Sequence, residues 1–298
     1  MNNFLQYCFG GSALGARYAL VALGFVVIHR ATGVINFAQG SIVALGAYFT
    51  FNAHQTWGLP FVVAVGIAVL GAAAVGVLIE RFILRRMAGE PVFSVIMLTI
   101  GLLFVIDQVV TMVWGQDAQN LGDPWGIDTV TAGEIVMAVE DLWSIGLAFA
   151  VVAAFFVFFH YSGTGLAMRA VAIDEEAAMA RGISVRRVVA VAWGISGAVA
   201  AIAGVTLASG PAALRPSVGL IALAAFPAMI LGGLDSPFGA VVGGFIIGIT
   251  QTLTAGYQPT HASWLGEDFQ AVTPYVVMIV ILMLRPYGLF GTKEVERL

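Results

Sequence analysis

Nine stretches of this chain are apolar over much of the length that a membrane-spanning helix needs, and short polar connections separate them. A spanning helix requires about 20 apolar residues, because the hydrocarbon core of a bilayer is about 30 Å thick. The expected spans are 5–29, 34–54, 59–80, 92–114, 142–161, 187–208, 219–232, 238–256 and 271–285. The stretch 219–232 is short for a full crossing, so the pattern predicts an all-α, polytopic integral membrane protein with eight or nine transmembrane helices, some of them discontinuous.

The composition excludes the other broad classes of protein. Of 298 residues, 60% are hydrophobic and 10% are charged, whereas a soluble domain carries about 25% charged residues. A soluble enzyme, a nucleic-acid-binding protein and a disordered chain are therefore ruled out. The single cysteine, Cys8, excludes an intrachain disulfide and a cysteine metal cluster. Without a linker or a composition shift, residues 1–298 form one membrane domain.

The few basic residues gather in alternate connections. They are Arg30, Arg81, Arg85, Arg86, Arg169, Arg181, Arg186, Arg187, Arg285, Lys293 and Arg297. The intervening connection 115–141 has six acidic residues and no basic one, and 209–218 has only Arg215. Because basic loops stay in the cytoplasm, this pattern predicts nine crossings with the N-terminus outside and the C-terminus inside. Within 115–141 we expect one short interfacial helix.

A polar connection at about 162–187 is the most informative of these cytoplasmic segments. It is helix-prone from Leu166 to Arg181, and Gly182 follows where a helix would stop. Such a helix suits docking into a cytosolic partner, with small residues allowing close approach and charged residues fixing register. A solvated connecting helix held by surface ion pairs explains the same pattern.

The second expected span carries the polar side chains Asn36, Gln39 and Ser41 among glycines. Amides inside a bilayer need hydrogen-bond partners, and glycine allows a helix to break or pack closely. Two interpretations remain open. The segment is a discontinuous helix that lines a substrate path near the bilayer midplane, or its side chains make hydrogen bonds between helices.

Glycines and charges mark two further features. Gly232 and Gly233 indicate a sharp turn, and the spacing of Gly239 and Gly243 gives the next helix a packing or hinge face, within this chain or toward a partner. Arg17 and Asp107 are charged residues inside expected spans. We predict that they pair, the alternative being that each lies separately near an interface.

Motifs for enzymatic chemistry are missing from the sequence. There is no G-x-x-x-x-G-K-[ST] loop for ATP, no H-E-x-x-H zinc motif and no G-x-S-x-G nucleophile elbow. We therefore expect no enzyme activity, no metal and no cofactor bound by this chain. If the chain takes part in active transport, another subunit must supply the energy.

Five segments in order resemble one family. They are GVINFAQGSIVALGAY at 33–48, RAVAIDEEAAMARGISVRRV at 169–188, AAIAGV at 200–205, AFPAMILGGLDSPFGAVVGG at 225–244 and RPYGLFG at 285–291. Together they resemble the branched-chain amino-acid ABC transporter permeases, specifically the first of the two paired permeases. The likeness extends over nearly the full chain.

The resemblance implies a permease subunit of an ATP-driven importer in the cell (inner) membrane. It implies a second homologous permease, two cytosolic ATPase subunits that use the ATP, and an external substrate-binding protein. The 162–187 segment would be the coupling helix, with ATPase contacts at Arg169, Ala170, Glu175, Ala178 and Gly182, while Asn36, Gln39 and Ser41 become pathway residues.

The substrate is less determined than the family. Gln39, where the family often has a histidine, and Asp107 depart from the usual pattern. Branched-chain or other hydrophobic amino acids are the expected cargo, and urea, short amides or another small polar solute are the alternative. A channel or secondary carrier that works without an ATPase is the competing class, opposed by the few ionisable residues within the spans.

Overall fold

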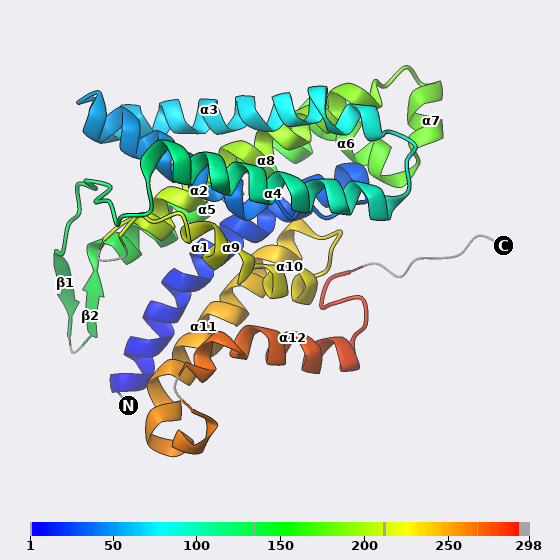
Figure 1. The fold of residues 1–298 in the computed structure, drawn as a ribbon. Coiled ribbons are helices and arrows are strands. Elements are labelled where there is room, and N and C mark those ends of the chain that lie inside the picture. The colour runs from blue at the N-terminus through cyan, green and yellow to red at the C-terminus, as the bar shows by residue number, and fades with distance from the viewer. Residues whose placement is uncertain (1, 134, 211–212, 267, 292–298) are drawn as a thin grey trace.

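A computed structural model describes residues 2–133, 135–210, 213–266 and 268–291, so Lys293 and Arg297 lie outside the described residues. The chain forms a bundle of helices with one small β-hairpin (Figure 1). Six helices of the described chain are long and apolar enough to cross a membrane. They are α1 (Asn2–Thr32), α3 (Phe61–Phe82), α4 (Val92–Trp114), α5 (Val139–Tyr161), α8 (Val185–Ala208) and α11 (Pro237–His261). Each lies within a few residues of an expected span, and α4 coincides with one.

The remaining expected spans form shorter helices. They are α2 (Gln39–Phe51), which continues into the π-helical turn Asn52–Thr56, then α9 (Val218–Leu223), α10 (Phe226–Gly232) and α12 (Thr273–Leu284). The expected span 34–54 becomes helical only at Gln39, because residues 33–38 are non-helical. The expected span 219–232 is divided between α9 and α10. Both breaks lie within the protein, where neighbouring helices can satisfy the freed backbone groups.

Helix α1 forms the centre of the bundle, since 83% of its apolar window is buried. It packs mainly against α11 and α8, and α11 crosses it closely at glycines. A Cβ atom on Gly248 would lie 2.2 Å from the backbone nitrogen of Gly15, which is far inside van der Waals contact. The glycine face of α11 therefore lets two helix backbones touch.

The two ends of the bundle differ in charge. One end, which we name the basic end, carries Arg30 in the last turn of α1, Arg85 in the turn after α3, Arg169 in the connection that follows α5 and Arg186 at the start of α8. The opposite end, which we name the acidic end, carries the 115–141 connection. Figure 1 shows the β-hairpin on the left, at the acidic end, and α6 (Gly163–Ile173) and α7 (Glu175–Ala180) on the right, at the basic end.

The expected interfacial helix in 115–141 is wrong, because this connection forms a β-hairpin. Strands β1 (Thr129–Ala132) and β2 (Ile135–Ala138) pair antiparallel. Their β-branched residues favour strands over helix, and Gly133 has a positive φ of 64°. The backbone N–H of Val136 donates to Oε1 of Gln6 at 3.0 Å, so the side chain of Gln6 ties the hairpin to the start of α1.

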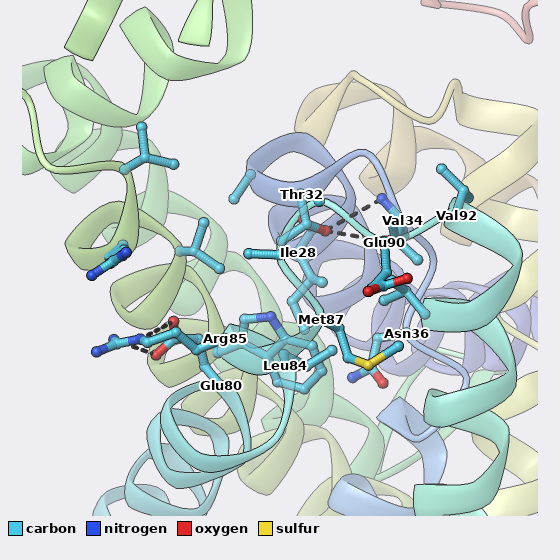
Figure 2. Close-up of a pocket in the computed structure, with 18 of the residues that line it drawn as sticks. Ile28, Thr32, Val34, Asn36, Glu80, Leu84, Arg85, Met87, Glu90 and Val92 are labelled. Carbon is cyan, nitrogen blue, oxygen red and sulfur yellow. Dashed lines mark hydrogen bonds and ion pairs between the residues drawn. The ribbon is translucent and has the colours of Figure 1, made fainter. Parts of the chain in front are cut away.

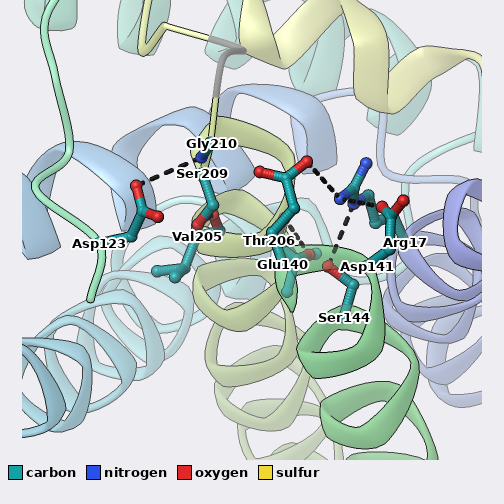
Figure 3. A network of polar contacts seen from close by, with 10 residues as sticks. Arg17, Asp123, Glu140, Asp141, Ser144, Val205, Thr206, Ser209 and Gly210 are labelled. Atoms are coloured by element: carbon teal, nitrogen blue, oxygen red, sulfur yellow. Dashed lines mark hydrogen bonds and ion pairs between the residues drawn. The ribbon is translucent and has the colours of Figure 1, made fainter. Parts of the chain in front are cut away.

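The expected pairing of Arg17 with Asp107 is also wrong. Arg17 donates instead to Asp141 at 2.9 Å, to Glu140 at 3.3 Å and to the hydroxyl of Ser144 at 3.2 Å (Figure 3). The reason is the packing, because α1 lies against α5, whereas α4 lies against α2. Asp107 therefore stands on a helix that Arg17 does not face.

Candidate functional site

The 162–187 connection forms two helices at the basic end, not the single helix expected over 166–181. They are α6 (Gly163–Ile173) and α7 (Glu175–Ala180). Asp174 separates them with an extended backbone (φ −158°), and its carboxylate accepts from the Ala177 N–H at 2.9 Å. An aspartate in this conformation is a favourable N-cap, which explains why it starts a new helix. Gly182 (φ 80°) ends the second helix at the position expected from the sequence.

The expected ATPase-contact residues differ in what they touch. Arg169 donates to the backbone carbonyls of Phe159 and His160, and its guanidinium lies 5.5 Å from the Phe159 ring centroid. It therefore holds α6 against the last turn of α5, whose free carbonyls favour a cation. Ala178 is buried against the bundle and Ala170 is half-buried. Glu175 and Gly182 are exposed at the surface.

Three apolar side chains of α6 and α7 are exposed at the basic end. Ile173 is 83% exposed, Leu166 59% and Met179 51%. The charge pattern of this connection does not indicate these residues. Their signal was that three large apolar residues interrupt a polar segment. Apolar side chains grouped on a surface outside the membrane indicate a protein contact.

A cavity of about 380 Å³ opens at the basic end beneath α7 (Figure 2). Glu175 and Met179 of α7 line one side of it. The non-helical stretch Val34–Asn36 lines another side, together with residues from α3, α4 and α8. The surface connection and the break before α2 therefore share one cavity. A movement of α7 would therefore change the cavity that the break also lines.

One wall of the cavity contains a buried ion pair that the sequence did not indicate. Glu80 is 2% exposed, and its two carboxylate oxygens accept from Arg85 at 2.8 and 3.1 Å (Figure 2). The five-residue spacing is not a helical pair. Helix α3 ends at Phe82, and the 3-10 turn Leu84–Met87 brings the arginine back over the glutamate. This bidentate pair fixes the chain between α3 and α4.

The three polar residues predicted to line a path in the second expected span are buried and hydrogen-bonded. Asn36, Gln39 and Ser41 are at most 1% exposed. The Ser196 hydroxyl donates to Oε1 of Gln39 at 2.9 Å, which links α2 to α8. The Ser41 hydroxyl donates to the Leu103 carbonyl at 3.2 Å, which links α2 to α4. Of the three side chains, Asn36 lines the cavity.

The glycines of the 226–253 segment pack within this chain. A Cβ atom on Gly232 would lie 2.1 Å from the carbonyl oxygen of Gly239, and one on Gly243 would lie 2.1 Å from that of Ala228. These approaches form a seam between α10 and α11. Gly233 (φ 108°) ends α10. Across the described residues, no group of three or more His, Cys, Asp or Glu is arranged to hold a metal ion.

Comparison with known proteins identifies the family. Residues 7–284 match the model of a family described as the permease component of the branched-chain amino acid transport system. The chain belongs to this family. It is therefore a multi-pass membrane permease component and not itself an enzyme. The match covers α6, α7 and all of the long helices except the first five residues of α1.

Two relatives of this permease match over nearly its full length. The high-affinity branched-chain amino acid transport system permease protein LivH of Escherichia coli (strain K12) is 31% identical, covering 99% of this chain and 97% of the relative. The corresponding protein BraD of Pseudomonas aeruginosa is 27% identical, covering 99% and 98%. Among solved structures, PsaBC from Streptococcus pneumoniae in complex with Fab is similar at a TM-score of 0.51 and 14% identity, covering 95% of this permease and 92% of that chain. That likeness shows the fold alone.

Proposed function

We infer that this permease is one of two transmembrane subunits of an ABC importer that carries branched-chain amino acids across the cell (inner) membrane. The names of its full-length relatives support this cargo. A second homologous permease completes the path, two cytosolic ATPase subunits bind and hydrolyse the ATP, and an external binding protein delivers the substrate. One observation carries the mechanism, namely that α7 lines the same cavity as the break before α2.

The basic end faces the cytoplasm in this proposal, because arginine-rich connections stay on that side. The acidic end and its hairpin then face the external binding protein. Helices α2 and α9–α10 count as crossings together with α12, so the chain crosses nine times with the N-terminus outside. The segment Val218–Gly232 spans about 22 Å as a helix, and non-helical chain within the bundle supplies the rest.

Helices α6 and α7 act as the coupling segment that receives the ATPase motion. Ile173, Glu175, Met179 and Gly182 present the exposed contact surface, while Arg169, Ala170 and Ala178 hold the segment on the bundle. ATP binding draws the two ATPase subunits together and moves α7. The movement reaches the break at residues 33–38 through the shared cavity. There Asn36 contacts the passing substrate, and Gln39 and Ser41 position the start of α2.

The coupling proposal is tested by Ile173→Asp, with Ile127→Asp as the matched control. Ile127 is also an exposed isoleucine, 89% accessible, but it lies at the acidic end. We expect Ile173→Asp to lose co-purifying ATPase subunits and leucine uptake while the permease remains folded in the membrane. Ile127→Asp should retain the ATPase subunits. Full ATPase retention and normal uptake in Ile173→Asp would show that this surface does not couple.

The same purification separates the competing class of transporter. A wild-type chain that purifies with ATPase subunits and supports uptake only when ATP is present is an ABC permease. A chain that purifies as a lone homo-oligomer and transports without ATP is a carrier or channel. Uptake assays with labelled leucine, urea and acetamide then distinguish the amino-acid cargo from small polar solutes.

A further inference from the structure

Helix α4 presents a largely uncovered face with polar groups in its middle. Only 6% of its apolar window is buried within the chain, and Phe104, Val105 and Met112 are 66%, 59% and 77% exposed. Gln108 is exposed on the same helix, and Asp107 beside it is half-buried. An amide or a carboxylate in contact with lipid tails has no hydrogen-bond partner and is strongly disfavoured. The part of this face around Gln108 therefore meets water or protein, not lipid.

Asp107 lies well inside the membrane-spanning part of α4, about 10 Å from Trp114 at the end of the helix. Its Oδ1 atom is buried and has no hydrogen-bond partner among the described residues. The neighbouring Ser41 hydroxyl donates to the Leu103 carbonyl and is also close enough to interact with the Asp107 carboxylate. Arg17, the expected partner, is bound to Glu140 and Asp141. The carboxylate therefore has unused capacity to accept a hydrogen bond.

The surroundings of Asp107 fit one end of an amino acid. Ser41 belongs to the first turn of α2, and the positive end of a helix favours a carboxylate nearby. A primary ammonium group carries three donors and a full positive charge. The Oδ1 atom of Asp107, which has no partner among the described residues, and the Gln108 carbonyl oxygen can accept hydrogen bonds from it. The exposed Phe104 lies one helical turn from both Asp107 and Gln108, the exposed Val105 lies one turn from Gln108, and both suit an aliphatic side chain.

We propose that the Asp107–Gln108 face of α4 lines the translocation path, and that the Asp107 carboxylate binds the ammonium group of the transported amino acid. This inference rests on the proposed import of amino acids. It makes Asp107 a residue that distinguishes amino-acid cargo from uncharged solutes such as urea. The second permease then lies across the path from α4.

Cysteine labelling tests whether this face of α4 is exposed to water. Replacing Cys8 by serine removes the single native cysteine, so only the introduced thiol reacts. Gln108→Cys is compared with Leu70→Cys, a 73% exposed apolar position on α3, in the assembled complex in proteoliposomes. We expect the Gln108→Cys thiol to react with a trimethylammonium thiosulfonate about tenfold faster than with its sulfonate analogue, because Asp107 attracts cations. Adding Asp107→Asn should abolish this preference. A Gln108→Cys thiol that is as unreactive as the thiol of Leu70→Cys would overturn the proposal.

Substrate protection tests the ammonium contact. Leucine is compared with 4-methylpentanoate, which has the same carbon skeleton and carboxylate but no ammonium group. Leucine at ten times its Kd should slow labelling of the Gln108→Cys variant about tenfold, and 4-methylpentanoate should not. Protection should disappear with Asp107→Asn and persist with Asp107→Glu. Equal protection by both compounds, or protection that survives Asp107→Asn, would contradict the assignment.

The same preparations separate this inference from the proposed function. A complex that retains its ATPase subunits and transports leucine, but whose introduced thiol is not protected by leucine, overturns the ammonium site alone. A chain that lacks ATPase subunits overturns the importer itself. Folding is monitored by gel filtration of each variant, and Asp107→Glu provides a charged variant if Asp107→Asn fails to assemble.

Discussion

The guanidinium of Arg17 lies 2.9 Å from the carboxylate of Asp141, joining residues 124 positions apart in the sequence. Both side chains are mostly buried, at 16% and 21% exposure, and Glu140 shares the arginine. The contact holds the middle of α1 against the start of α5 (Figure 3). Two carboxylates share one cation here, so removal of the arginine leaves both without this ion pair.

Arg17→Ala should destabilise the permease by about 3 kcal/mol, because it leaves two poorly solvated carboxylates without a cation. Thermal unfolding of the purified complex measures the loss. Arg215→Ala serves as a control, since Arg215 is exposed and its loss should change stability by no more than about 0.5 kcal/mol. In a double-mutant cycle, Arg17→Ala should couple to Asp141→Ala and simply add to Asp107→Asn. If Arg17→Ala instead couples to Asp107→Asn and adds to Asp141→Ala, Arg17 pairs with Asp107.

Gly243→Ala and Gly66→Ala should have opposite effects on stability. A Cβ on Gly243 would meet the Ala228 carbonyl oxygen at 2.1 Å, whereas a Cβ on Gly66 has nothing within 4 Å. Overpacking should cost about 1–3 kcal/mol at Gly243. At Gly66 alanine should stabilise α3 by up to about 1 kcal/mol, because glycine is a poor helix former. Equal melting temperatures for the two variants would refute the seam between α10 and α11.

Ser196→Ala should destabilise the chain by about 1–3 kcal/mol, because it removes the closer donor to the buried Gln39 amide oxygen and leaves only the Asn36 amide at 3.5 Å. Combining it with Gln39→Met removes both partners and should recover most of that loss. We expect the double variant to transport leucine normally, and Asn36→Ala, at the cavity, to reduce uptake. If the double variant folds but loses uptake, Gln39 is itself a pathway residue.

Asp174→Ala should weaken coupling by fraying α7. Removal of this N-cap costs about 1 kcal/mol, which is large for a helix of six residues. Uptake per ATP hydrolysed should fall, and Asp174→Ser should restore it. Glu176→Ala removes a neighbouring exposed charge without touching the cap, so it should leave the ratio unchanged. Loss of coupling in Glu176→Ala alone would point to charge instead of helix geometry.

The long helices follow directly from the sequence, because a bilayer requires apolar segments of a fixed length. For that reason α4 has the bounds that its pattern predicts, and Gly182 ends α7 where a left-handed residue was needed. Comparison with known proteins also confirms the family resemblance. These predictions depend on properties of one segment at a time.

The errors concern features that depend on two segments or on local backbone geometry. Which helix faces Arg17 is decided by the packing of α1 on α5, and apolar periodicity does not encode it. The Glu80–Arg85 pair needs the 3-10 turn after α3. In the expected coupling helix, the propensity of the surrounding alanines favoured continuity, whereas Asp174 capped a new helix instead. The β-hairpin forms from two runs of four residues each, both containing β-branched residues, which are too short to be recognised by a pattern of 20-residue spans.

The central position of α1 has a consequence for how the protein is made. Helix α1 leaves the ribosome well before its main neighbour, α11, which begins at residue 237, 205 residues after α1 ends at residue 32. At about 5–20 residues per second, synthesis of that interval takes about 10–40 s. During this time the glycine face of α1 is not yet covered by α11. Until α5 has been synthesised, Arg17 also lacks its carboxylate partners. A membrane chaperone or the insertion machinery that shelters α1 would therefore act early in biogenesis.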